Sequence, residues 1–157
     1  MKRIVLYVLL LAAALLAPVE RADVGKLRPI ETVSVYKENG WVVLRTDTDD
    51  VGIGGTATQA LQNMKDTASG IIYLDTAKYL LIEKGAEDAA EELRQMLKGN
   101  VKLCMASKEI APADATKYLS AHRDLPAMRT WQRGQELPVL MQYAKRLIIL
   151  KKVENNA

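Results

Sequence analysis

The chain has 157 residues, of which 22 are basic and 19 acidic, giving a formal net charge of +3. Such a balanced charge, with only two Trp and six Tyr, does not provide the basic, aromatic-rich surface of a nucleic-acid-binding domain. A single cysteine, Cys104, excludes an internal disulfide. Without its N-terminal segment the chain still suits one domain with a core of its own.

The first 19 residues have the features of an export segment. Two basic residues, Lys2 and Arg3, precede the apolar run Ile4–Val19. A positive start and an apolar core of this length are typical of a signal peptide, whereas a transmembrane helix needs roughly 20 apolar residues. No good cleavage site follows the run, so we expect residues 1–19 either to be cleaved or to stay as a membrane anchor. The remainder is predicted to lie on the outer face of the cytoplasmic membrane or to be secreted.

A hairpin is predicted at the start of a single domain that covers residues 30–153, after a linker over residues 20–29. Ile30–Tyr36 alternates apolar and polar residues, and Trp41–Thr46 forms its partner strand. The Asn39-Gly40 pair between them suits a type I′ turn, because both residues tolerate positive φ angles. Residues 154–157 are predicted to be a frayed tail.

Amphipathic helices alternate with apolar runs in the rest of the chain. We predict helices over 56–67, 86–98 and 112–121, a short helix over 125–133, and apolar strands over 71–74, 78–82 and 101–106. Gly99-Asn100 is predicted to end the second helix in the left-handed conformation. Residues 138–152 fit either a helix or, over Leu147–Leu150, a strand, and we predict a helix. This order indicates an α/β (α+β) fold, a small mixed β-sheet with helices packed on it.

The acidic loop Thr46–Asp50 and the glycines after it are two candidate binding sites. The loop lacks the spacing and the closing Glu of an EF-hand, so we predict a solvated loop tip there. Gly52, Gly54 and Ala57 fit the loose form of the dinucleotide fingerprint, with Asp75 at the place of a ribose-binding acid. The preceding strand is half-polar, however, and a pyrophosphate would meet the acidic loop. We predict that Gly52–Ala57 is a flexible turn before a helix, and keep a nucleotide- or small-ligand-binding domain as the alternative.

No catalytic, metal or cofactor site can be assembled from the remaining reactive residues. Cys104 lies in an apolar run, where a buried thiol acts as a small hydrophobic group. His122 is the single histidine, follows a predicted helix and has no cysteine nearby. We therefore predict no enzymatic activity, no metal and no cofactor.

Four cations, Lys145, Arg146, Lys151 and Lys152, make the C-terminal part basic. They could form a weak contact with an anionic membrane surface, but we predict a solvated face.

Three stretches in this order resemble one known family. They are TATQALQNM, GIIYLDTAKYLLIEKGAEDAAEELRQML and NVKLCMASKEIAPADATKYL. Together with the N-terminal segment and the hairpin, they resemble the N-terminal domain of the Ger(x)C family, the lipoprotein C-subunits of spore germinant receptors. The resemblance covers Ile30–Leu119, although family members carry a lipobox cysteine and are more than twice as long.

The resemblance implies an exported or membrane-associated envelope protein of a spore-forming bacterium, with a binding or assembly role and no known catalysis. We therefore expect a protein-interaction domain linked to sporulation or spore germination. Its expected partner is a protein of the cell or spore envelope, with membrane contact through residues 4–19 and no nucleic acid.

Overall fold

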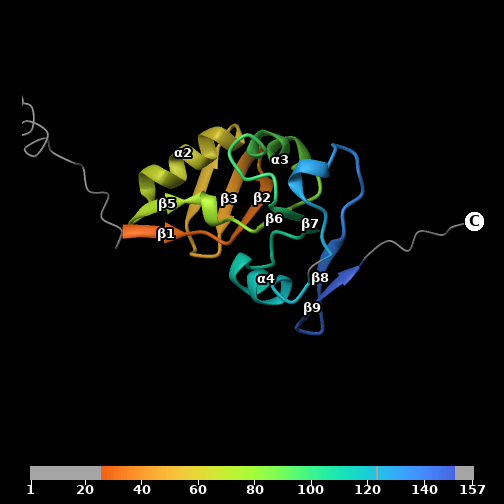
Figure 1. The fold of residues 1–157 in the computed structure, drawn as a ribbon. Helices are drawn as coiled ribbons and strands as arrows, with labels where there is room; N and C mark the ends of the chain where they lie inside the picture. Colours follow the sequence, from red (N-terminus) through yellow and green to blue (C-terminus); the bar gives the residue numbers. More distant parts are fainter. Residues whose placement is uncertain (1–25, 123, 151–157) are drawn as a thin grey trace, which may run out of the picture.

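The computed structural model describes residues 26–122 and 124–150 (Figure 1). The predicted export segment and the predicted tail lie outside the described residues. Within the described ranges, no helix has the length and apolar character needed to cross a membrane.

A seven-stranded mixed sheet forms the centre of the molecule, in the order β4-β3-β2-β6-β7-β8-β9. Its strands are β2 (Thr32–Glu38), β3 (Trp41–Thr46), β4 (Val51–Gly54), β6 (Tyr79–Ile82), β7 (Lys102–Ala106), β8 (Val139–Tyr143) and β9 (Arg146–Leu150). β2, β6, β7 and β8 are parallel, while β3, β4 and β9 pair antiparallel with their neighbours. The mixed α/β fold is as predicted, and β7 is an inner strand of the sheet.

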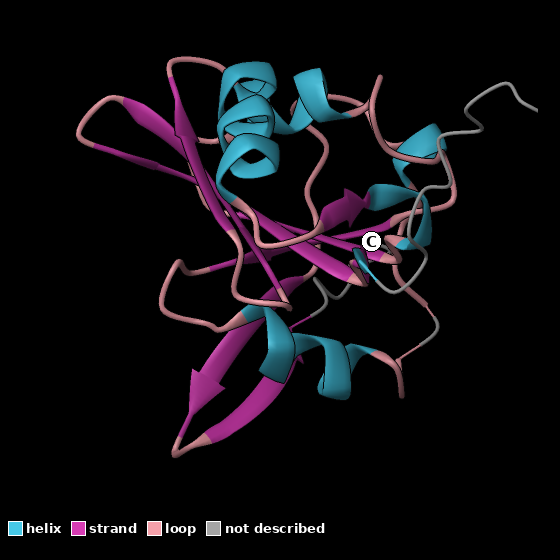
Figure 2. Ribbon diagram, turned by 90° about the vertical axis from the view of Figure 1, so that its left-hand side faces the viewer, coloured by secondary structure: helices cyan, strands magenta, loops and turns pink. Residues whose placement is uncertain are grey.

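Helices cover both faces of this sheet (Figures 1 and 2). α2 (Ala57–Thr67) and α3 (Glu87–Leu93) pack on one face, and α4 (Pro112–Leu119) packs on the other. Successive strand residues point to opposite faces, so Leu80 and Ile82 join the first core cluster and Leu81 joins the second. Short 3₁₀ turns, η2 (Leu74–Thr76) and η3 (Met128–Thr130), complete the chain.

The predicted first hairpin and the predicted first helix are both present. Asn39 and Gly40 have φ angles of 51° and 83°, as a type I′ turn between β2 and β3 requires. Thr56 caps α2, because its hydroxyl accepts a hydrogen bond from the N–H of Gln59.

The predicted C-terminal helix over residues 138–152 is wrong, because β8 and β9 form an antiparallel hairpin there. Its turn consists of Ala144 and Lys145, with φ angles of 47° and 64°. Neither residue is one of the glycines or asparagines that usually occupy these positions, so the turn carries no sequence signal.

Other predicted boundaries also change. The second predicted helix is shorter than expected, because α3 ends at Leu93. Neither Gly99 nor Asn100 has the predicted positive φ angle, and the chain turns there with a hydrogen bond from the Val101 N–H to the Lys98 carbonyl. The short helix over 125–133 is only the turn η3. The end of the predicted linker is β1 (Leu27–Pro29), which pairs with β5 (Ile71–Tyr73) in a separate parallel sheet.

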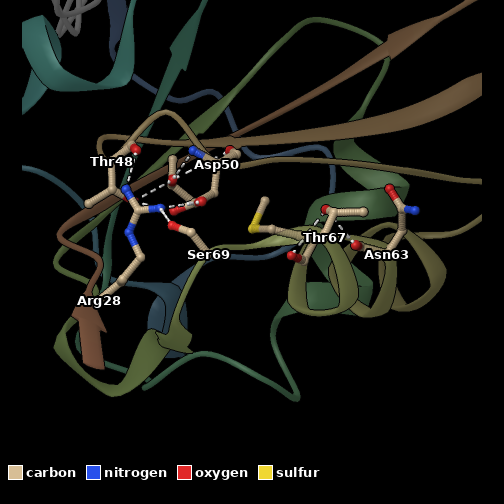
Figure 3. A network of polar contacts seen from close by, with 8 residues as sticks. Arg28, Thr48, Asp50, Asn63, Thr67 and Ser69 are labelled. Carbon is tan, nitrogen blue, oxygen red and sulfur yellow. Dashed lines mark hydrogen bonds and ion pairs between the residues drawn. The ribbon is translucent and has the colours of Figure 1, made fainter. Parts of the chain in front are cut away.

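The acidic loop is not the solvated tip that the sequence suggests. An Asp47 carboxylate oxygen accepts hydrogen bonds from the N–H groups of Glu31 and Thr32, at 3.1 and 3.2 Å. Asp50 pairs with Arg28 at 2.8 Å, and its side chain is only 8% exposed. Arg28 also donates to the Thr48 carbonyl and to the Ser69 hydroxyl (Figure 3). The acidic loop is the connection between β3 and β4, and these contacts bind it to β1 and to the start of β2.

Candidate interaction surface

The β8–β9 hairpin continues the sheet beyond the parallel strands (Figure 2). β8 pairs with β7 only through Val139 and Leu140, because β7 ends at Ala106. Residues 141–143 of β8 pair with β9 alone. The hairpin therefore projects past its neighbouring strand.

The two faces of the hairpin have different surroundings. Leu140 is 1% exposed and packs in the core cluster under α4, with Leu147 and Ile149 packed against it. The residues of the opposite face are mostly uncovered. This surface, here called the outer apolar face, consists of Val139, Met141, Tyr143, Ile148 and Leu150. They share one side, since side chains alternate along a strand and the register sets Val139 opposite Leu150 and Met141 opposite Ile148.

Large exposed fractions confirm that the outer apolar face is open among the described residues. Val139 is 38% exposed, Met141 43%, Leu150 51% and Tyr143 73%. Contiguous exposed apolar patches larger than a few hundred Å² commonly mark a binding surface. The hairpin thus has the composition of an interaction surface.

Shallow hollows lie along the same hairpin. One of about 530 Å³ is lined by Lys84, Glu87, Met105 and Arg133 and reaches Val139, where the parallel strands end. The carboxyl ends of parallel strands are where ligands usually bind in α/β sheets. Another hollow, beneath the hairpin tip, is lined by Glu109, Asp114, Gln142, Lys145 and Leu147. The first hollow borders the outer apolar face at Val139, whereas the second lies on the opposite face of the hairpin, where Gln142 and Leu147 point.

The sequence of the hairpin and of the residues directly after it is basic. The stretch from Pro138 to Val153 contains four cations and no acidic residue. Lys145 and Arg146 form no ion pair with any described residue. The basic character of this part was predicted from the sequence. The outer apolar face was not predicted, because in a helix over residues 138–152 these apolar side chains would not share one side.

The glycines of the predicted nucleotide loop have a different role. Gly52 and Gly54 belong to the edge strand β4, and α2 lies directly on them. A Cβ atom at Gly52 would lie 2.0 Å from the Ala60 carbonyl oxygen, and one at Gly54 would lie 2.4 Å from the Ala60 nitrogen. These glycines allow close packing of helix on strand. The turn predicted over Gly52–Ala57 is strand as far as Gly54, and α2 begins at Ala57.

The remaining positions of that motif are also engaged within the protein. The N–H of Ala57, at the start of α2, donates to a carboxylate oxygen of Glu92 at 2.8 Å. Asp75 lies on η2, after a strand of the separate two-stranded sheet, and pairs with Lys98 at 4.0 Å. A pyrophosphate at this helix end would have to displace a protein carboxylate.

Cys104 and His122 lie where the sequence predicts. Cys104 is 1% exposed, and burial raises the pKa of its thiol to about 12. His122 follows α4, and its ring stacks on Tyr118 with centroids 4.3 Å apart. Within the part of the chain that the structure describes, no group of three or more His, Cys, Asp and Glu side chains could hold a metal ion.

Comparisons of the chain with protein-family models, curated proteins and solved structures found no match.

Proposed function

We propose that this chain is a non-enzymatic protein-interaction domain that binds a partner protein through the outer apolar face of the β8–β9 hairpin. The observation that carries the proposal is the contrast between the two faces. Leu140 is buried in the core under α4, whereas Met141 and Tyr143 on the other face are 43% and 73% exposed. Tyr and Met are enriched in protein interfaces, where their large side chains supply much of the contact area.

The proposed location is the outer face of the cytoplasmic membrane, or the medium outside the cell. The basic start and the apolar run Ile4–Val19 support export. The resemblance to the Ger(x)C family supports a partner in the cell or spore envelope and a role in sporulation or spore germination. The domain would then assemble with other envelope proteins.

Site-specific photo-cross-linking in the producing cells tests this function. A photoreactive residue at position 143 should cross-link one discrete partner, recovered with the chain in the membrane or secreted fraction. The matched control places the same group at the exposed position Thr58 on α2, at the far end of the sheet. Equal labelling from both positions, or recovery of the full-length chain from the cytosol, would contradict the proposal.

A further inference from the structure

The two edges of the seven-stranded sheet differ in how their backbone groups are bonded. At the β4 edge, the N–H of Ile53 donates to Oδ1 of Asn63 at 3.0 Å, and the N–H of Gly55 donates to Gln59 at 3.0 Å. Side chains of α2 thus occupy two donors of this edge, those of Ile53 and Gly55. Such protection is a common way in which proteins prevent pairing at a free strand.

The β9 edge has no comparable cover among the described residues. No described side chain forms a hydrogen bond with the backbone of Arg146–Leu150. In a hairpin with a two-residue turn, the pair next to the turn exchanges both of its hydrogen bonds, here Tyr143 with Arg146. The pattern then alternates, so the backbone groups of Leu147 and Ile149 point away from β8. β9 also lacks the proline, bulge or inward charge that blocks edge strands.

We propose that β9 accepts an extended segment of a partner protein as an eighth strand, and that this segment has alternating apolar residues between acidic ends. This inference rests on the proposed function and specifies the kind of partner. Backbone hydrogen bonds to Leu147 and Ile149 would hold the added strand, as in other cases of strand addition. Its apolar side chains would extend the outer apolar face beside Ile148 and Leu150.

The acidic ends follow from the charges at the two ends of β9. Lys145 and Arg146 stand at its start, and Lys151 and Lys152 follow its last residue in the sequence. Glu109 and Asp114 line the hollow that Lys145 borders, so they offset part of the charge at the tip. Opposite charges at facing positions stabilise strand pairs, and like charges destabilise them.

The same charges disfavour a second copy of this chain at the β9 edge. A second β9 strand paired at this edge would offer no acidic residue to Lys145 and Arg146, because Arg146–Leu150 contains none. The two-fold symmetry of such a pair leaves these cations uncompensated in both copies. A different protein with acidic residues would neutralise the cations at this edge, which a second copy would not.

Two synthetic peptides test the proposal with the full-length chain in detergent. The probe EDVTVTVDE has acidic ends, and the control KKVTVTVKK has the same centre with basic ends. We expect the acidic peptide to bind at least about tenfold more tightly than the basic one, with an affinity that falls as salt is added. Fluorescence anisotropy of labelled peptides measures both effects. Equal binding of the two peptides, or binding of neither, would overturn the proposal.

A pair of substitutions at one position separates backbone pairing from side-chain contact. Ile149→Pro removes an outward N–H, which an edge strand tolerates, and Ile149→Ala removes the same side-chain packing but keeps the N–H. We expect Ile149→Pro to weaken binding of the acidic peptide at least about tenfold more than Ile149→Ala. Circular dichroism and thermal unfolding show whether both variants are folded. Equal affinities of two folded variants would overturn strand addition.

Failure of this inference can be distinguished from failure of the proposed function. If position 143 still cross-links its partner in cells while neither peptide binds, the interaction domain stands and strand addition does not. Sedimentation of the full-length chain tests whether a second copy of the chain occupies the β9 edge. A dimer that Ile149→Pro dissociates and Ile149→Ala does not would overturn the proposal in favour of a second copy.

Discussion

Gly52 in β4 and Ala60 in α2 touch through their backbones, so that a Cβ atom at position 52 would lie 2.0 Å from the Ala60 carbonyl oxygen. Gly52→Ala should therefore push the helix from the strand and destabilise the fold by about 1–3 kcal/mol, the usual cost of overpacking. Urea unfolding followed by circular dichroism measures the loss. Gly55→Ala is the control, because there the nearest atom, 3.1 Å away, is the end of the flexible Gln59 side chain. Equal losses for both variants would contradict this packing.

The same contact leads to an expectation about nucleotides. With Gly52 and Gly54 covered by α2 and the Ala57 N–H bonded to Glu92, we expect millimolar ATP or NAD to leave the melting temperature unchanged. Thermal unfolding with and without each nucleotide measures this, since a ligand that binds only the folded state raises its stability. A rise in melting temperature that saturates with nucleotide concentration would restore the nucleotide-binding alternative.

Asp47 should stabilise the fold although it lies in a loop. Its carboxylate accepts from the N–H groups of Glu31 and Thr32. Asp47→Asn should cost about 1–2 kcal/mol, somewhat less than the roughly 1.5–3 kcal/mol of a hydrogen bond to a charged group, because the Asn amide oxygen still accepts. The control is Asp49→Asn, whose side chain is 79% exposed and pairs with Arg45 at 3.2 Å. An exposed pair of this kind is worth under about 1 kcal/mol. Chemical denaturation should rank the two variants in this order, and the reverse order would contradict the account.

Cys104 should be unreactive in the folded protein. Because burial raises the pKa of its thiol from 9.0 to about 12, almost no thiolate is present at pH 8, and the side chain is also covered. An aromatic disulfide reagent should modify the thiol at once in denaturant and very slowly without it. The folded-state pKa lies above the unfolded one, so this thiol should lower stability only as the pH rises above about 9. Rapid labelling of the native chain at pH 8 would contradict the buried position.

The fold was largely predictable where local signals and tertiary packing agree. The Asn39-Gly40 turn and the apolar run that became β7 each specify an element on their own. The β8–β9 hairpin was missed because the Ala144-Lys145 turn lacks the residues that favour positive φ.

The candidate surface was less predictable than the fold. Its charge is visible in the sequence. Its apolar face depends on which residues share one side of a strand, and the helical periodicity that was predicted here distributes those residues over different sides. The role of the glycines in β4 was not predicted for a related reason. Close packing of a helix on a strand and binding of a phosphate both require a residue without a Cβ atom, and only the helix position distinguishes them.

Hydrogen exchange at two amides tests the central claim, that β9 is an open edge available to a partner. In the full-length chain, the Ile149 N–H should exchange near the rate of an unstructured amide. The Ile53 N–H, which is bonded to Asn63, should exchange at least about tenfold more slowly. Added EDVTVTVDE peptide should slow Ile149 and leave Ile53 unchanged. If Ile149 is as strongly protected as Ile53 without any peptide, the edge is already covered and the account is contradicted.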